Sequence, residues 1–113
     1  MSRRSPELLL EDILESAEKI ERYTRDIDQR SFKEDEKTVD AVVRNLEVIG
    51  EAANRLPDQF KHENMSIDWS GIIGLRHRIV HDYFGIDIEI VWRIIQHDLP
   101  ALKQNLAAIK HSE

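Results

Sequence analysis

Apolar residues recur at steps of three and four along most of the chain, the spacing that builds one buried side of an α-helix. The first run follows Ser5, Pro6 and Glu7, a capping residue, a proline and an early carboxylate that are typical of a helix start. Its apolar seam consists of Leu10, Ile13, Ala17, Ile20, Thr24 and Ile27. The pattern predicts a long first helix with one apolar side.

A second long helix is predicted after it. Ser31 and Glu34 have the spacing of a capping box at its start, and Pro57 ends it after about Leu56. Its seam consists of Val39, Val42, Leu46, Ile49, Ala53 and Leu56. This heptad-like spacing predicts near-antiparallel packing against the first helix.

The rest of the chain predicts shorter helices. We expect an irregular loop over residues 57–68, and then a third helix from about Trp69 that Gly85 stops as a left-handed cap. Asp87 is placed to cap a fourth helix, and residues 98–100 resemble the start of a last one. No stretch alternates as a strand does, and no linker or repeat divides the chain. The pattern predicts an all-α fold of about five helices in one domain, residues 1–113.

Composition supports a small helical protein. Hydrophobic residues make up 41% and charged residues 34% of the 113 residues. The absence of cysteine excludes disulfides and thiolate metal sites. No apolar run approaches the ~20 residues that cross a bilayer, and the start of the chain has no signal-peptide pattern. We expect a cytoplasmic protein with no membrane partner.

The charge is uneven. A formal net charge of −6 argues against a general, lysine-coated nucleic-acid binder. Between Trp69 and His81, however, there is no carboxylate, and Arg76, His77 and Arg78 lie in this interval. A nucleic-acid site would therefore be local, while the acidic remainder either repels nucleic acid or attracts a basic partner.

Arg76, His81 and Tyr83 form an Arg-x4-His-x-Tyr motif in this interval. A guanidinium offers a fixed charge and a planar set of donors suited to phosphate. An imidazole takes and returns a proton near neutral pH. Phosphodiester cleavage needs both capabilities even without a metal. The plain alternative is that Arg76 makes surface ion pairs, His81 is a cation at a helix end, and Tyr83 packs with its hydroxyl exposed.

Helical geometry separates the members of this motif. In a regular helix, Arg76 and His81 lie ~140° apart around the axis and ~7.5 Å apart along it, whereas Arg76 and Tyr83 lie within ~20° of each other. Either the helix is distorted near His81, or a second copy of the chain completes the site across a two-fold axis. We favour the second arrangement, a homodimer with a composite cleft.

His77 and His81 also have the spacing of two metal ligands on a helix. A third ligand is not evident, because Asp82 adjoins His81 but is expected to point elsewhere, and His62 would have to reach the site from the loop. We therefore expect no physiological metal.

Other residues of the second helix bear on the site. Glu47, Glu51 and Arg44 share one side of it, which is either a solvated surface or a surface that meets the third helix and orients Arg76. Gly50 is expected to mark a close approach of two helices. Trp69 and Trp92 are expected to be core or dimer anchors.

These motifs resemble those of proteins in the HEPN superfamily, and within it those of the HepT-like toxins. The resemblance covers nearly the whole chain. It rests on Gly74-Leu-Arg76 with His81-Asp-Tyr83, on Arg44-Asn45-Leu46-x-x-Ile49-Gly50-Glu51-Ala52, and on the segments Ile67-Asp68-Trp69, Val91-Trp92 and Leu99-Pro100. His77 supplies the polar residue that the superfamily favours after the arginine. Asp68 departs from the proline that is common before the tryptophan.

The resemblance implies an all-α homodimer of the HEPN type, a ribonuclease that cuts RNA rather than DNA and needs neither metal nor cofactor. Arg76 and His81 would be catalytic, with His77, Glu51 and Asp82 in supporting positions. It also implies a type VII-like toxin–antitoxin system, in which an MntA-like nucleotidyltransferase antitoxin adenylylates Tyr83. The main alternative is a non-catalytic helical module that docks on such a nucleotidyltransferase and binds nucleotide. A metal-binding bundle that uses His77 and His81 is a third possibility.

Overall fold

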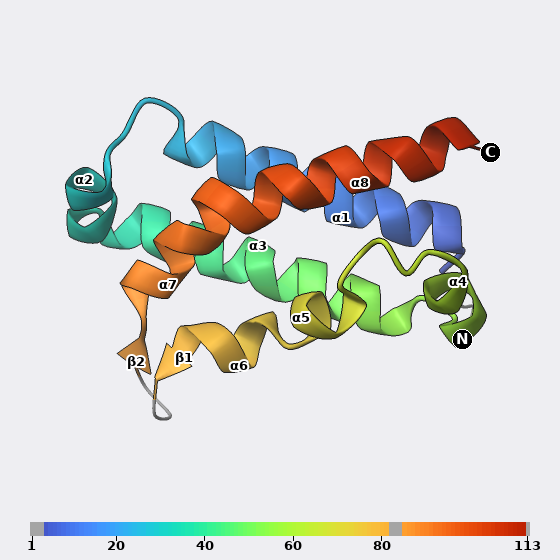
Figure 1. Cartoon of the computed structure of the whole chain (residues 1–113). Helices are drawn as coiled ribbons and strands as arrows, with labels where there is room; N and C mark the ends of the chain where they lie inside the picture. Colours follow the sequence, from blue (N-terminus) through green and yellow to red (C-terminus); the bar gives the residue numbers. More distant parts are fainter. Residues whose placement is uncertain (1–3, 82–84, 113) are drawn as a thin grey trace.

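Two long antiparallel helices and a third that packs on the first make the body of the molecule (Figure 1). They are α1 (Pro6–Thr24), α3 (Glu36–Arg55) and α8 (Leu99–Ser112). The computed structural model describes residues 4–81 and 85–112, and within this part no helix is long and apolar enough to cross a membrane. The predicted all-α bundle and the antiparallel pairing of its two long helices are confirmed.

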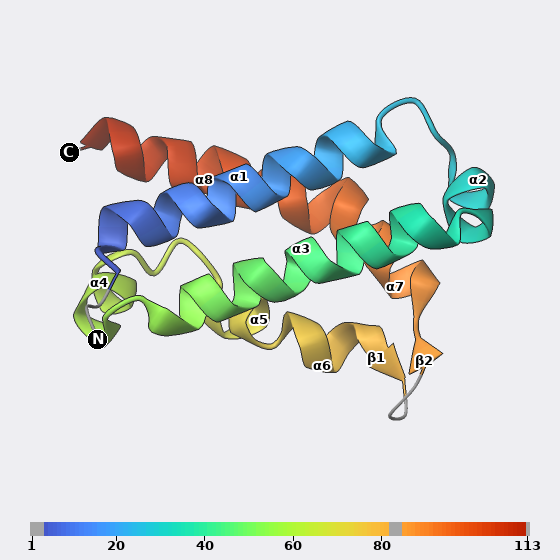
Figure 2. The same ribbon diagram turned by 180° about the vertical axis from the view of Figure 1, so that it is seen from behind.

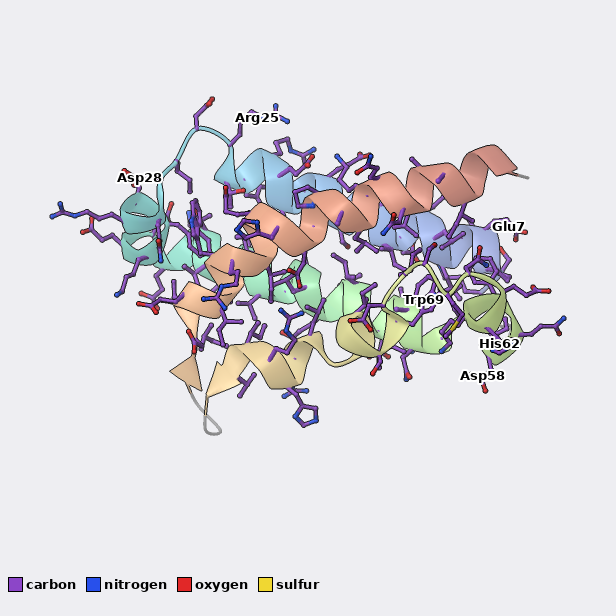
Figure 3. All side chains as sticks on the ribbon, viewed as in Figure 1. Glu7, Arg25, Asp28, Asp58, His62 and Trp69 are labelled. Atoms are coloured by element: carbon purple, nitrogen blue, oxygen red, sulfur yellow. The ribbon has the colours of Figure 1, made fainter. Side chains whose placement is uncertain are left out.

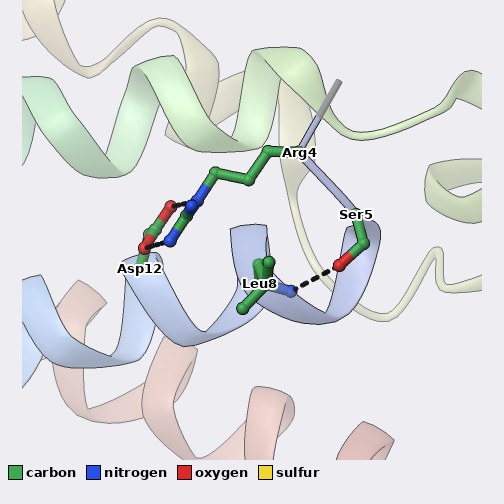
Figure 4. Close-up of polar contacts among 4 residues, drawn as sticks. All are labelled: Arg4, Ser5, Leu8 and Asp12. Carbon is green, nitrogen blue, oxygen red and sulfur yellow. Dashed lines mark hydrogen bonds and ion pairs between the residues drawn. The ribbon is translucent and has the colours of Figure 1, made fainter. Parts of the chain in front are cut away.

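The predicted start of α1 is confirmed in atomic detail (Figure 4). The Ser5 hydroxyl accepts a hydrogen bond of 3.3 Å from the backbone N–H of Leu8, which is one of the otherwise unpaired donors of the first turn. Arg4 donates two hydrogen bonds, of 2.6 and 2.9 Å, to the Asp12 carboxylate and so ties the entering chain to the helix. The helix ends at Thr24, because the next residue, Arg25, has an extended backbone (φ −64°, ψ 133°), and Asp26 then adopts a left-handed one (φ 65°).

The start of the second long helix differs from the prediction. Ser31 lies inside a separate short helix, α2 (Gln29–Glu34), and its backbone N–H donates to the Asp28 carboxylate at 2.8 Å. The cap of α3 is Asp35, whose carboxylate accepts from the backbone N–H and the hydroxyl of Thr38 at 3.1 and 2.6 Å. The expected capping box is therefore wrong, because two aspartates at good capping positions replace it.

The predicted seams meet in the core. The fully buried side chains include Ile13, Ile20, Phe32, Val42, Leu46 and Ile49. Each such side chain contributes about 1.5–3 kcal/mol through its removal from water. An ion pair of 2.6 Å between Lys103 and Glu21 joins α8 to α1. The centroid of the Phe32 ring of α2 lies 5.3 Å from that of the half-buried Trp92 ring. Trp92 therefore packs against the core, as expected.

The segment expected to be an irregular loop contains a short helix, α4 (Asp58–Glu63). Trp69 packs against this segment. Its indole N–H donates a hydrogen bond to the backbone carbonyl of Asn64 at 3.0 Å, and its ring is edge-on to that of Phe60, with 6.2 Å between the ring centroids. Its side chain is buried, so the expectation of a core anchor is confirmed.

The predicted third helix is two short helices followed by a hairpin. Helix α5 (Trp69–Ile73) is capped by the Asp68 carboxylate, and α6 (Leu75–Ile79) begins after Gly74. Strands β1 (Val80–His81) and β2 (Gly85–Ile86) then pair antiparallel, with Val80 opposite Ile86 and His81 opposite Gly85. Figure 2 shows the α5–α6 segment beside α3, with the hairpin at its far end. The expected left-handed cap at Gly85 is wrong, because Gly85 lies in β2 and no glycine of the described residues has a positive φ.

The helices that follow the hairpin are continuous with one another. Asp87 caps α7 (Ile88–Arg93) as predicted, by accepting from the backbone N–H of Ile90 at 3.2 Å. No new start occurs at residues 98–100, because α7 runs through the π-helical turn η1 (Ile94–Asp98) directly into α8. Pro100 lacks an N–H, and its ring would clash with the carbonyl four residues earlier in a regular helix. The wider π turn lies where that clash would occur.

Candidate active site

Helix α6 displays three consecutive basic side chains. Leu75 and Ile79, one turn apart, are buried and fix α6 on the core. The residues between them, Arg76, His77 and Arg78, are therefore exposed.

The two arginines point to different neighbours, since residues two apart in a helix lie ~200° apart around its axis. Arg78 donates to the Asp98 carboxylate of η1 at 2.8 Å. Arg76 instead lies on the side of α6 that meets α3. Among the described residues, no hydrogen bond or ion pair engages its guanidinium. Of the two arginines of α6, Arg76 is thus the one without a partner in the part of the chain that the structure describes.

Two hollows of about 210 Å³ each adjoin Arg76. The first lies between α3 and the α5–α6 segment, and is lined by Leu46, Glu47, Gly50, Glu51, Asn54, Ile73 and Arg76. The second continues to the hairpin, and is lined by Val43, Glu47, Arg76, Ile79, Val80, Gly85 and Ile86. Of the residues that the structure describes, Arg76 and Glu47 alone line both hollows.

Gly50 allows the close contact on which this arrangement depends. A Cβ atom at this position would lie 3.2 Å from the carbonyl oxygen of Ile72 and 3.6 Å from that of Ile73, which are backbone atoms of α5. The expected close approach of two helices at Gly50 is confirmed. It places the α5–α6 segment, and with it Arg76, against α3.

The predicted site residues are only partly described. The backbone of His81 lies in β1, opposite Gly85, whereas its side chain lies outside the described part of the chain, as do Asp82 and Tyr83. Because α6 ends at Ile79, the regular helix assumed for the angles between Arg76, His81 and Tyr83 does not extend that far. That assumption is wrong, because the helix ends before His81. The composite cleft of a homodimer stays a prediction.

The supporting residues have separate positions. His77 is exposed on α6, and Glu51 lines the first hollow but is joined to Arg55 by an ion pair of 3.1 Å. Sequence reasoning missed the hairpin, whose Val80 and Ile86 line the second hollow. Their β-branched side chains are the only signal that favoured strands there.

The structure gives no support to His62 as a third metal ligand. His62 lies on α4, at the end of the molecule opposite the β1–β2 hairpin (Figure 3). Within the described part of the chain, no three His, Cys, Asp or Glu side chains are grouped to hold a metal ion.

Comparison with known proteins places this chain in a family. The family model described as "Ribonuclease HepT-like" matches residues 13–109. The chain is 42% identical to "Probable ribonuclease HepT" of Thermococcus cleftensis, over 89% of this chain and 92% of that protein. It is 37% identical to "Putative RNase MJ1380" of Methanocaldococcus jannaschii, over 96% of this chain and 100% of that protein.

A further relative shows the same unit within a longer protein. "Gamma-glutamylcyclotransferase and putative RNase MJ0434" of Methanocaldococcus jannaschii is 36% identical over 95% of this chain but only 48% of its own length. No solved structure matches at a significant level. With the all-α fold and a family match across most of its length, this chain belongs to the HepT-like ribonuclease family.

Proposed function

We propose that this protein is an endoribonuclease, the toxin of a toxin–antitoxin pair, which cuts RNA without a metal ion. The observation that carries the proposal is Arg76: an exposed guanidinium without a partner among the described residues, beside two hollows, in a chain of the HepT-like ribonuclease family. The relatives named as ribonucleases support RNA as the substrate.

In the proposed reaction RNA supplies its own nucleophile, the 2′-hydroxyl. Arg76 binds the scissile phosphate and stabilises the added negative charge of the pentacoordinate transition state. His81 is a proton-transfer group, and in its protonated form it donates to the leaving 5′-oxygen. The products are a 2′,3′-cyclic phosphate and a 5′-hydroxyl. DNA is excluded as a substrate because it lacks the 2′-hydroxyl.

The site assignment is tested by single substitutions. Arg76→Ala is expected to lower kcat/KM on RNA by about 10²–10³-fold, because a fixed charge at the transition state is lost. His81→Ala is expected to lower it by about 10²–10⁴-fold, the usual share of a general acid or base. Arg93→Ala, which removes an exposed arginine from α7 outside both hollows, is the matched control. Full activity in both site variants would overturn the assignment.

The assembly belongs to the same proposal. The family resemblance supports a homodimer, whereas the geometric reason for a composite cleft no longer applies, because α6 ends before His81. Mixing Arg76→Ala and His81→Ala chains tests the cleft directly. Recovered activity means that one site uses residues of both chains. A site built from one chain stays inactive in every mixture.

We also propose that a minimal nucleotidyltransferase antitoxin adenylylates Tyr83. The added phosphodiester carries a negative charge that can pair with Arg76 and occupy the place of the scissile phosphate. Intact-mass measurement with and without the antitoxin should show one or more added AMP groups, together with loss of cleavage. A Tyr83→Phe chain should remain active and unmodified, and modification elsewhere in this variant would contradict the proposal.

Cell growth separates the toxin from a non-catalytic docking module. Expression of this chain alone should arrest growth, and His81→Ala should relieve the arrest. A docking module would cause no arrest in either case.

A further inference from the structure

Glu47 is the carboxylate that shares both hollows with Arg76. It lies on α3 and is half-buried, whereas Glu51, one turn later, is exposed and ion-paired with Arg55 at 3.1 Å. Among the described residues, neither a hydrogen bond nor an ion pair occupies the Glu47 side chain. A half-buried carboxylate and an exposed guanidinium, neither with a partner among the described residues, therefore line the same space.

The second hollow also connects Glu47 with the segment that carries His81. Val80 and Gly85 line this hollow together with Glu47, and the backbone of Gly85 pairs with that of His81. The hairpin thus brings the chain at His81 to the edge of the space that Glu47 and Arg76 share. This proximity does not depend on a second copy of the protein.

We infer that Glu47 is the general base of the reaction, a role that rests on the ribonuclease function proposed above. An ionised carboxylate only accepts hydrogen bonds, so it is a competent acceptor for the 2′-hydroxyl proton. A carboxylate beside a phosphate is repelled by it, but Arg76 lines the same hollows and offsets both negative charges.

The proton and bond changes balance within one chain. Glu47 takes the proton of the 2′-hydroxyl as the 2′-oxygen attacks phosphorus. The bond from phosphorus to the 5′-oxygen breaks, and His81 gives its proton to that oxygen. After product release the Glu47 carboxyl loses its proton to water and the His81 imidazole takes one up. Base, acid and phosphate-binding group are then present without the second histidine that a composite site would supply.

The test uses the full-length chain with three variants: Glu47→Gln, Glu47→Asp and, as matched control, Asp40→Asn. Asp40 is an exposed carboxylate of α3 outside both hollows, so its variant makes the same change of charge on the same helix. Glu47→Gln keeps the side-chain shape but not the base, and should lower kcat by about 10²–10⁴-fold. Glu47→Asp should retain part of the activity, and Asp40→Asn all of it. Circular dichroism should show an unchanged fold.

The pH profile separates a base from a residue that merely orients Arg76. A general base must be ionised to accept the proton, so kcat/KM should rise with pH on the acid side of the profile. In Glu47→Gln this acid-side rise of kcat/KM should disappear. Loss of the rise together with loss of kcat supports the inference, and an unchanged profile or an effect on KM alone overturns it.

The inference and the function on which it rests fail in different ways. If Glu47→Gln cleaves RNA within about threefold of the unmodified chain while Arg76→Ala and His81→Ala do not, the ribonuclease function stands and the role of Glu47 is refuted. If the unmodified chain does not cleave RNA at all, the proposed function is refuted and the role of Glu47 with it.

Discussion

Replacement of Gly50 tests the contact that places Arg76. In α3, Gly50 faces the backbone of α5, and a Cβ atom there would lie 3.2 Å from the Ile72 carbonyl oxygen. That distance is a few tenths of an ångström tighter than an ordinary contact. Gly50→Ala probes a small displacement of α5, and Gly50→Leu a large one.

The magnitudes follow from two opposing effects. Alanine is favoured over glycine in a helix interior by about 1 kcal/mol. The cost of a small shift of α5 offsets this gain. Gly50→Ala should therefore change the free energy of unfolding by less than about 1 kcal/mol. Leucine gains nearly as much from helix propensity, but it adds three further carbons at a position where the Cβ atom alone lies 3.2 Å from the α5 backbone. Overpacking costs about 1–3 kcal/mol, and the separation of α5 from α3 exposes additional apolar surface. We expect Gly50→Leu to lose about 2 kcal/mol net.

Urea denaturation followed by circular dichroism measures both changes. Asp40→Leu is the control, because it places the same side chain at an exposed position of α3 and should stay within about 0.5 kcal/mol of the unmodified chain. Gly50→Leu should also lose RNA cleavage under conditions where it remains folded, since Arg76 moves with α5–α6. A Gly50→Leu chain as stable as the control would refute the packing of α5 on α3.

Two further outcomes test the fold. Phe32→Ala should lower the free energy of unfolding by about 3–5 kcal/mol, because Phe32 is fully buried against Trp92. Urea titration measures this loss. A loss below about 1 kcal/mol would contradict the packing of α2. The side-chain and backbone hydrogen bonds from Thr38 lower the pKa of Asp35. A lowered pKa stabilises the fold at pH values above the unfolded pKa of about 4, and this contribution disappears as pH falls through the folded value. The urea midpoints of the unmodified chain and Asp35→Ala should therefore differ at about pH 7 and approach each other as pH falls below about 4. A constant difference would exclude the cap.

The sequence predicts the long helices well because their seams repeat over five or more turns. Helices α1 and α3 and the close approach at Gly50 follow from that periodicity and from a glycine in an otherwise regular helix. Local features are harder to predict. Ser31, Asp28 and Asp35 are all good capping residues within one short segment, and propensity alone does not rank them. Tertiary packing of Phe32 favours a separate helix α2.

The candidate site is predictable in its residues but not in its geometry. Arg76 stands out by charge and spacing, and its exposure agrees with a binding role. The hairpin does not stand out, because strands of two residues each are too short to show alternation. Without the hairpin, a regular helix through His81 is the natural assumption, and it separates His81 from Arg76. The sequence leaves open whether the side of α3 that carries Glu47 is solvated or meets the third helix, and the hollows that Glu47 and Arg76 both line decide for the contact.

The central claim is that this chain cleaves RNA by metal-free transesterification, and the chemistry of the cut ends tests it most directly. Purified protein should cut RNA in excess EDTA and leave 2′,3′-cyclic phosphate and 5′-hydroxyl ends, and Arg76→Ala should lose this cleavage. Cleavage that requires added magnesium and leaves 5′-phosphate ends would contradict the claim.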